Sequence, residues 1–303
     1  MTLIVGLSGG PDSVFLLYLF SQLQQSYNLN LIAAHLNHEW REDAHKDVIF
    51  CKKLAQLYNV TFISETASSL PPVRSTSSQE ERGRLLRRAF FEQLYKQHTA
   101  HSITLAHHQD DQIETFFIRL ARGAGLQGLT GMKPREGKYI RPLLSVTKQQ
   151  IISFLDNHDI PYLTDPTNTS MAFLRNRIRH TLLPTLTECD KRYPHSIIRT
   201  MSHLEEANNF MQDHIQKLFA QHTEKSTSGH WLHISAVLQL HPFAKKQLIL
   251  HWLITEGILF TPSAGLFNEI IRFLKNKKSH EHTLYNSWKI TKKKDFALLT
   301  CLS

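Results

Sequence analysis

The stretch from Gly6 to Ser13 reads Gly-Leu-Ser-Gly-Gly-Pro-Asp-Ser and decides how the rest of the sequence is interpreted. It follows a short apolar run, Leu3–Leu7, and precedes a segment over 12–26 with helical periodicity. Glycine lets the backbone turn sharply and approach a ligand closely, and a helix start adds unpaired N–H donors and partial positive charge. The stretch therefore predicts an anion-binding loop suited to phosphate between a strand and a helix.

The side chains of this loop add hydroxyl donors and one acid. Ser8 and Ser13 supply the hydroxyls, and Pro11 is compatible with a first helical turn. Asp12 would repel a bare phosphate, so we expect a Mg²⁺ ion between the two groups. The loop lacks the lysine of a Walker loop, which excludes that class of phosphate site.

Strands and helices alternate over the first 122 residues, which predicts a doubly wound, mostly parallel sheet covered by helices on both faces. Ligands bind to such sheets at the carboxyl ends of the strands. Beyond the first strand and helix, the expected strands are Leu31–Leu36, Val60–Ser64, Ser102–Ala106 and Tyr139–Leu144, and the expected helices are 43–58, 79–98, 110–122, 147–158 and 171–182.

The sequence predicts three parts: a catalytic domain over 1–190, a helical linker over 191–225, and a smaller α+β domain over 226–303. The last part has ten Lys and Arg against four Asp and Glu, so it carries +6 of the net charge of +9. A basic balance favours a polyanionic partner, nucleic acid first. We therefore expect 226–303 to bind RNA. The Ser-, Thr- and Pro-rich stretch 66–80 is expected to be a mobile loop, either a linker or a lid.

Composition bounds the class of protein. Of 303 residues, 41% are hydrophobic and 20% are charged, which are globular values. Three cysteines form no CxxC pair, which indicates a reducing compartment. Since no apolar run approaches the ~18 residues of a membrane span, we expect a soluble, cytoplasmic protein. The sequence does not define the oligomeric state, and a homodimer is kept open.

More motifs follow in a fixed order. They are His35-Leu-Asn-His38 with Arg41, Ala106–Thr115 (AHHQDDQIET), Arg122-Gly-Ala-Gly-Leu126, Arg141-Pro-Leu-Leu144, Asp165-Pro-Thr-Asn168 and Phe173-Leu-Arg-Asn-Arg-Ile-Arg179. In this order, and with the glycine stretch, the set resembles the tRNA(Ile)-lysidine synthase family of N-type ATP pyrophosphatases, also called PP-loop proteins. The resemblance covers residues 3 to about 186.

The resemblance implies a ligase that uses ATP to adenylate the wobble cytidine of tRNA(Ile) with a CAU anticodon. Free lysine then displaces AMP and gives lysidine, which switches the tRNA from methionine to isoleucine identity and AUA decoding. It also implies ATP as substrate with Mg²⁺ as cofactor, and Asp12 as a catalytic residue and metal ligand. The implied ATP-binding residues are Ser8, Gly9, Gly10, Pro11, Asp12 and Ser13.

Two acids at the start of the helix over 110–122, Asp111 and Glu114, suit a cation, either Mg²⁺ or a substrate ammonium. A lysine ammonium must lose a proton before it attacks, and either acid could accept it. The resemblance assigns both residues to lysine binding and catalysis. Charge complementation of the helix start is the alternative.

Several arginines match basic positions of the family. Arg87 would stabilise the transition state at the ATP phosphates, although Arg88 follows it and leaves the register open by one residue. Arg175 and Arg179 share a helix face and suit phosphates. Together with Arg122, they are assigned to the tRNA backbone or the adenylate, with solvated surface as the alternative.

Two other functions remain open. A PP-loop tRNA thiolase would transfer sulfur and needs reactive or cluster-binding cysteines near the site, whereas Cys51, Cys189 and Cys301 are expected away from the motifs. A non-catalytic nucleotide- or RNA-binding module would keep the glycines and could lose Asp12, Asp111 and Glu114.

Overall fold

The computed structural model describes residues 1–73, 79–164, 173–258, 263–284 and 288–301. The chain forms two compact units, Met1–Leu204 (unit 1) and Glu205–Ser303 (unit 2). Their boundary falls inside one long helix, α9 (Tyr193–His222), so the residues predicted as a separate linker are divided between the two units. The functional assignment of the three predicted parts stays a prediction. The motif Asp165–Asn168 and part of the predicted loop 66–80 lie outside the described residues.

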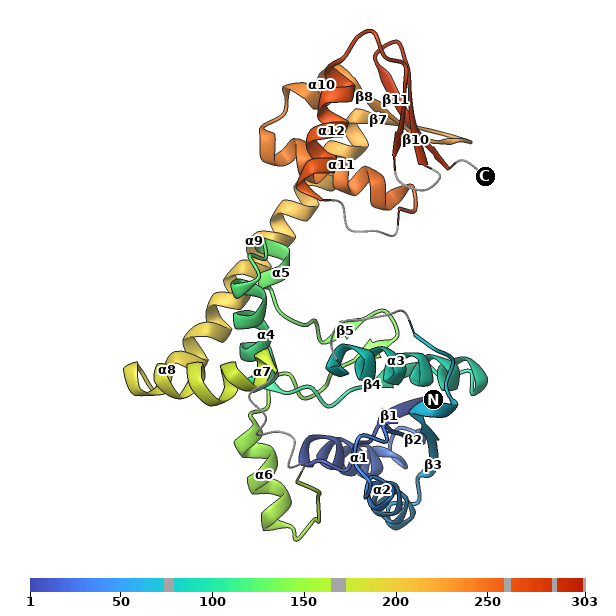
Figure 1. Cartoon of the computed structure of the whole chain (residues 1–303). Helices are drawn as coiled ribbons and strands as arrows, with labels where there is room; N and C mark the ends of the chain where they lie inside the picture. Colours follow the sequence, from blue (N-terminus) through green and yellow to red (C-terminus); the bar gives the residue numbers. More distant parts are fainter. Residues whose placement is uncertain (74–78, 165–172, 259–262, 285–287, 302–303) are drawn as a thin grey trace. The chain divides into compact units, whose positions relative to one another are not determined.

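Unit 1 contains a six-stranded, mostly parallel sheet, which confirms the predicted α/β class (Figure 1). The strands β1, β2 and β4 are buried along most or all of their length because both faces of the sheet are covered. Only the edge strand β5 runs antiparallel, against β6. The strand order is β3 (Thr61–Thr66), β2 (Asn30–Asn37), β1 (Thr2–Gly6), β4 (Ser102–Thr104), β6 (Tyr139–Ile140) and β5 (Arg135–Glu136).

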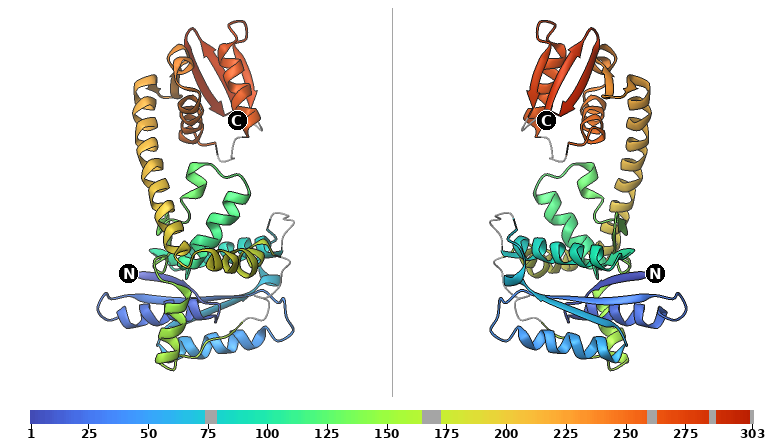
Figure 2. Two further views of the ribbon diagram at one scale, coloured as in Figure 1. Left: turned by 90° about the vertical axis from the view of Figure 1, so that its left-hand side faces the viewer. Right: turned by 90° about the vertical axis from the view of Figure 1, so that its right-hand side faces the viewer.

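Helices cover both faces of this sheet (Figure 2). Alternate residues of β1 point to opposite faces, so Leu3 and Val5 pack into one core cluster and Ile4 into another. Phe90 of α3 joins Ile4 in the second cluster. The first face is covered by α1 (Pro11–Leu23), α2 (His45–Leu57) and α6 (Lys148–Asn157), and the second by α3 (Gln79–Gln97).

A smaller helical cluster completes unit 1. Buried Ile113, Ile178 and Leu183 pack together with partly buried residues at the start of α9. The described part of the helix predicted over 171–182 begins at Leu174 and is interrupted by a π-helical turn, because Pro184 has no N–H to give to the preceding turn. The helical segments of unit 1 not yet given are η1 (Ala67–Ser69), α4 (Gln109–Ala121), α5 (Leu126–Leu129), α7 (Leu174–Arg177), the π-helix η3 (Ile178–Leu182) and α8 (Leu183–Cys189).

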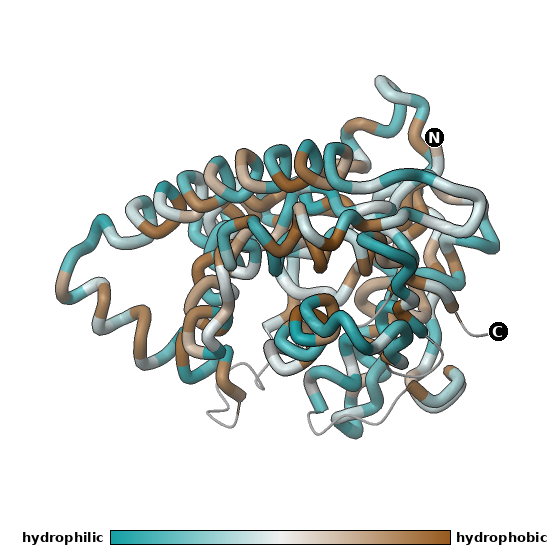
Figure 3. The backbone as a smooth tube through the Cα atoms, turned by 90° about the horizontal axis from the view of Figure 1, so that it is seen from above, coloured by the Kyte–Doolittle hydropathy of each residue, from teal (hydrophilic) through white to brown (hydrophobic). Residues whose placement is uncertain are grey.

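Unit 2 is an antiparallel sheet with helices, as the predicted α+β class requires. Its core is centred on fully buried Trp252 and includes Ile215 and Phe219 from the end of α9. Hydrophobic residues recur along the helices as short patches in the hydropathy-coloured trace (Figure 3). The strand order is β7 (Thr223–Ser226), β8 (Gly229–His233), β11 (Phe296–Cys301), β10 (Trp288–Lys293) and β9 (Glu281–Leu284), with helices α10 (Ile234–Gln239), α11 (Pro242–Thr255) and α12 (Ala264–Lys275).

Not every basic residue of unit 2 is available to a partner. Lys292 is buried, and its Nζ donates to the carbonyl oxygens of Phe273, at 2.9 Å, and Asn276. It therefore neutralises the carboxyl end of α12. Burial lowers the pKa of this ammonium.

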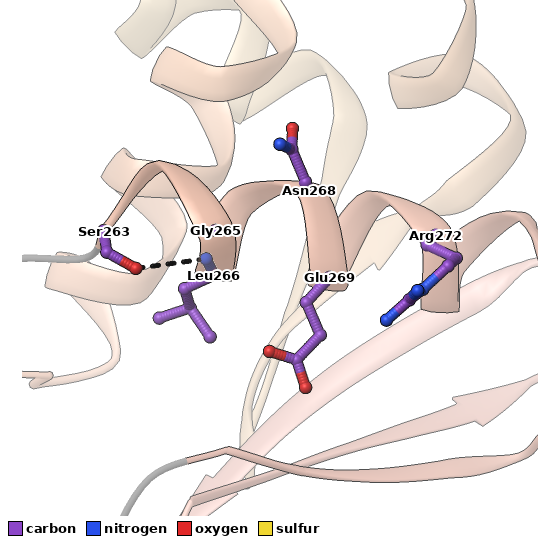
Figure 4. A pocket seen from close by; sticks show the side chains of 6 residues that line it. All are labelled: Ser263, Gly265, Leu266, Asn268, Glu269 and Arg272. Carbon is purple, nitrogen blue, oxygen red and sulfur yellow. Dashed lines mark hydrogen bonds between the residues drawn. The ribbon is translucent and has the colours of Figure 1, made fainter.

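A pocket of about 470 Å³ lies along α12 (Figure 4). Ser263 caps the N-terminus of this helix by accepting from the Leu266 N–H at 3.2 Å.

None of the described helices is long and apolar enough to cross a membrane. The cytoplasmic location stays a prediction.

Two leucines of α1 provide a matched test of the sheet core. Leu16 is fully buried between α1 and the sheet, whereas Leu23 is 40% exposed. Leu16→Ala should lower the free energy of unfolding by about 2–5 kcal/mol through lost burial and a cavity. Leu23→Ala should change it by about 0.5 kcal/mol. Urea unfolding followed by circular dichroism measures both, and equal losses would contradict this packing.

Candidate active site

A cavity of about 390 Å³ lies at the carboxyl ends of β1, β2 and β4. The strand order reverses direction beside β1, and such a switch point is where doubly wound sheets bind ligands. Three loops meet there, and each directly follows a strand. The lining includes Ser8, Asp12 and Ser13 after β1, His38 and Trp40 after β2, His107 and Asp111 after β4, and Arg87 and Arg175 from helical segments.

The glycine loop, Gly6–Ser13, connects β1 to α1 as predicted. Gly9 has φ +88, and a Cβ there would lie 2.8 Å from Leu163, so only glycine fits. The hydroxyls of Ser8 and Ser13 are 3.1 Å apart, and the Ser13 hydroxyl donates to the Gly10 carbonyl at 2.9 Å. The loop is thus preformed around its own serines at the positive end of α1.

Asp12 holds an unpredicted partner. The Lys148 Nζ donates to both carboxylate oxygens of Asp12 at 2.7 Å. Lys148 is the first residue of α6, and its backbone N–H donates to Asp110 at 2.8 Å. The starts of α1, α4 and α6 are therefore tied together at one edge of the cavity. The glycine loop contains no lysine of its own, and Lys148, 136 residues after Asp12, supplies one.

The buried imidazole of His108 lies among three carboxylates. Its ring nitrogens are 3.7, 3.4 and 3.5 Å from oxygens of Asp12, Asp110 and Asp111. Burial lowers the pKa of His108, but the surrounding carboxylates outweigh it and raise the pKa above the ordinary value. The backbone N–H of His108 also donates to Asp111 at 3.0 Å, which fixes the start of α4.

Other histidines at the cavity are kept neutral. Burial, with help from the positive charge of Arg87, lowers the pKa of His38 to about 4. Burial also lowers the pKa of His107 to about 4, against the opposing charge of Asp111. His35 is held by a 2.9 Å contact between its Nδ1 and the Leu7 carbonyl. Among the described residues, no cluster of three His, Cys, Asp or Glu forms a metal site.

The two acids predicted to bind lysine occupy different positions. Asp111 lines the cavity. Glu114 is only 1% exposed and is held by arginines, with Oε2 3.3 Å from Arg175 and Oε1 2.6 Å from Arg179. Burial raises the pKa of Glu114, although both guanidinium groups oppose this. In this conformation, a substrate reaches Asp111 directly and Glu114 only if an arginine moves.

The arginines also separate. Arg87 lines the cavity, while Arg88 contacts Glu92 at 3.1 Å and lies 5.0 Å above the Tyr139 ring. The sequence did not decide whether Arg87 or Arg88 lies near the ATP phosphates, and this geometry favours Arg87. Arg122 is exposed at the end of α4, eleven residues beyond Asp111 and therefore ~16 Å along the helix axis. It does not line the cavity.

Comparisons with known proteins identify the family of this chain. Residues 1–186 match the family model of the PP-loop domain. A tRNA(Ile)-lysidine synthase from Chlorobaculum tepidum is 32% identical over 283 residues, which are 90% of this chain and 83% of the relative. The chain belongs to the tRNA(Ile)-lysidine synthase family. Another member, from Geobacter sulfurreducens, is 37% identical over 75% of this chain, which spans about half (49%) of the relative's length.

A solved structure supports the fold of this family member. The U34-tRNA thiolase NcsA from Methanococcus maripaludis, solved with its 4Fe-4S cluster, has a TM-score of 0.56 and 19% identity. The match covers 68% of this chain and 72% of that one. At this identity the likeness concerns the fold alone.

One cysteine of this tRNA(Ile)-lysidine synthase family member lies nearer to the site than predicted. Cys51, on α2, packs beneath the glycine loop, and a Cβ built on Gly9 would lie 3.3 Å from its sulfur. The expectation that all three cysteines lie away from the motifs is therefore wrong, because the sequence did not reveal that α2 packs beneath the loop. Burial raises the pKa of Cys51 to about 12, so its thiol stays protonated and unreactive.

The buried ion pairs of Glu114 give a testable difference. Glu114→Gln removes the charge between Arg175 and Arg179, and should lower the free energy of unfolding by about 2–3 kcal/mol because the arginines lose a buried partner. The matched variant is Glu136→Gln, whose carboxylate is 68% exposed and contacts Arg141 at 2.9 Å. It should cost under about 1 kcal/mol. Chemical denaturation measures both, and equally small losses would refute a structural role for the Glu114 pairs.

Proposed function

We propose that this protein is an ATP-dependent ligase that adenylates the wobble cytidine of tRNA(Ile) with a CAU anticodon and joins free lysine to it. The observation that carries this proposal is one cavity that combines a phosphate-binding loop, an aspartate that lines the cavity and two arginines. Asp12 of the loop and Asp111 line the cavity, and both lie beside the His108 Nε2, while Arg87 and Arg175 also line it. Family membership supports the same activity.

ATP would place its phosphates at the glycine loop, where the N–H groups at the start of α1 and the hydroxyls of Ser8 and Ser13 can donate. The other loop residues, Gly9, Gly10 and Pro11, shape this cradle. Mg²⁺ fits the site, because one carboxylate beside substrate phosphates is a usual way to hold this ion. Asp12 would be its ligand, and the ion would neutralise phosphate charge. Asp12 would then bind Mg²⁺ in place of Lys148, and the Lys148 ammonium would become available to contact the phosphates.

In the first step, the O2 atom of the cytidine attacks the α-phosphorus of ATP, and the bond to pyrophosphate breaks. Arg87 and Lys148 would stabilise the negative charge that develops on the phosphoryl oxygens. In the second step, the lysine ε-amine attacks C2 of the adenylated base and AMP leaves. The protein mainly positions the reactants and supplies fixed charges around them.

Asp111 is proposed to hold the lysine ammonium and to accept its proton before attack. Glu114 would contribute to lysine binding only after release from Arg175 or Arg179. Each arginine released in this way could bind the adenylate or an RNA phosphate. Lysine binding and phosphate binding would thus be coupled through Glu114.

RNA binding is proposed to involve unit 2, whose excess charge is positive. Lys275, Lys277 and Lys278 are all exposed at and beyond the end of α12. Arg122 is exposed as well and is proposed to meet the RNA backbone outside the cavity. Electrostatic binding of this kind weakens steeply with salt. The homodimer stays a prediction.

The thiolase alternative has less support. The Cys51 thiol is buried and un-ionised, and Cys189 and Cys301 lie in different units. No three cysteines are close enough to hold a cluster within the part of the chain that the structure describes.

A label-transfer assay tests the proposed function. The protein is incubated with ATP, Mg²⁺, radiolabelled lysine and total bacterial tRNA, and acid-precipitable label is counted. ATP-dependent label that survives mild base, unlike an aminoacyl ester, is expected. Pyrophosphate release without label would favour another nucleophile, sulfur first. A binding module without catalysis would release no pyrophosphate.

Asp111→Asn should separate the two steps. Lysine transfer should fall by about 100-fold or more, because the ammonium loses its acceptor. Pyrophosphate release that depends on tRNA should be retained, since Asp111 acts after adenylation. Asp213→Asn, the same change at an exposed position of α9, is the control. An equal loss of both activities would contradict this division of roles.

The RNA role of unit 2 is tested by charge removal rather than by deletion, because its core draws on Ile215 and Phe219 of α9. Changing Lys275, Lys277 and Lys278 to Gln should raise the KM for tRNA about ten-fold and leave the KM for ATP unchanged. The matched control changes three exposed lysines of α2 to Gln: Lys46, Lys52 and Lys53. If both triple variants behave alike, unit 2 has no special role in RNA binding.

A further inference from the structure

A second cavity adjoins the catalytic one and is used by nothing in the mechanism above. This side pocket has a volume of about 450 Å³. It shares His38, Glu39 and Trp40 with the catalytic cavity, so these residues form the wall between the two. The rest of its lining is Ala67, Ser68, Gln79, Arg82, Gly83 and Leu86.

The wall presents an aromatic surface. The rings of His38 and Trp40 are stacked, with centroids 4.5 Å apart and planes inclined by 22°. Trp40 is still 49% exposed, which is unusual for a large apolar side chain at a cavity. The low pKa of His38, about 4, keeps its imidazole neutral at physiological pH.

The helix opposite is shaped to admit this indole. Gly83 lies inside α3, where glycine is unfavourable for a helix. A Cβ at Gly83 would lie 2.7 Å from the Trp40 Cη2 and Cζ2 atoms and 3.3 Å from the His38 ring. Any larger residue would displace the stacked pair, so α3 carries glycine at the point where the indole edge meets it.

The turn that carries Trp40 is also fixed. Glu39 has φ +57, and its N–H donates to the Asn37 side chain at 2.9 Å. The Glu39 carboxylate accepts from the Ser68 N–H at 2.9 Å. The indole is therefore presented by a turn held on both sides, not by a loose loop.

We propose that the His38–Trp40 pair is a stacking platform for a nucleobase of the RNA substrate, next to the base that reacts. This inference rests on the proposed function. An enzyme that reacts with C2 of a base must take that base out of its stack, and the neighbouring base then loses a stacking partner. Exposed aromatic rings replace such partners in proteins that bind single-stranded RNA.

The geometry favours RNA over the adenine of ATP. The side pocket includes no residue of the glycine loop Gly6–Ser13, which binds the phosphates in the proposed function. Its cation, Arg82, is exposed, as a group that meets a phosphate of an extended strand must be. A base on the far side of the wall from the glycine loop would lie beside the cytidine in the catalytic cavity.

The test compares variants of the full chain in binding and turnover. Trp40→Ala should raise the Kd for the tRNA(Ile) CAU transcript about ten-fold or more, as loss of base stacking does, with the KM for ATP unchanged. Trp40→Phe should recover most of the affinity because a flat ring remains. Tyr27→Ala, at another exposed aromatic residue of unit 1, should have no effect.

Two further measurements separate stacking from a general structural effect. Gly83→Ala should weaken RNA binding like Trp40→Ala, without lowering Tm, and should add nothing when combined with it. Transcripts that are abasic on either side of the wobble cytidine are also compared. One of the two abasic transcripts should bind to the wild type more weakly than the intact transcript does. The same abasic transcript should bind to the wild type and to Trp40→Ala with equal affinity.

An unchanged Kd for Trp40→Ala overturns the platform while lysine transfer by the wild type still supports the proposed function. A rise in the KM for ATP alone assigns the indole to adenine and also overturns it. Loss of lysine transfer in the wild type itself would instead refute the proposed function.

Discussion

The parallel pairing of β1 with both β2 and β4 is the constraint on which the site depends. β1 pairs with β2 from Thr2 to Gly6 and with β4 from Leu3 to Val5. Since the three strands run in one direction, the loops that follow them emerge at one edge. Residues about 100 positions apart in the chain thereby face the same cavity. The burial of apolar side chains on both faces of β1 holds this register, because a slip of one residue would exchange the two cores.

Electrostatic interactions at this edge are arranged as shared rather than isolated pairs. Asp12 contacts Lys148 and lies near His108, and His108 in turn lies near Asp111. Glu114 is shared by two arginines. Asp12, His108 and Glu114 therefore each have more than one charged neighbour, and a ligand can replace one contact while the others remain. Such an arrangement suits a site that must accept phosphates, an ammonium and RNA in turn.

Local patterns were sufficient to predict most of unit 1. The alternation of apolar strands and periodic helices gave the parallel sheet, and the glycines around Ser8 gave the loop and its place at a helix start. The contact of Lys148 with Asp12 could not be predicted, because nothing in sequence marks two residues 136 apart as neighbours. The same limit applied to Cys51, which packs beneath the loop. Glu114 shared the predicted helix face with Asp111. Its burial could not be predicted, because it depends on Arg175 and Arg179 from later segments.

The π-helical turn over Ile178–Leu182 has a consequence for the register of the segment that carries Arg179. Residues five apart lie about 140° from each other around an α-helix, at 100° per residue. Ile178 and Leu183 nevertheless join one buried cluster with Ile113. The wider turn thus accommodates one residue more than an α-helix would, as a single-residue insertion does. Removing one residue there would place Leu183 four positions after Ile178, about 40° away around an α-helix, so the segment would return to α-helical winding with Leu183 still in the core. Winding the present sequence as a regular α-helix without removing a residue would instead rotate Leu183, and everything after it, by about 100° out of the core.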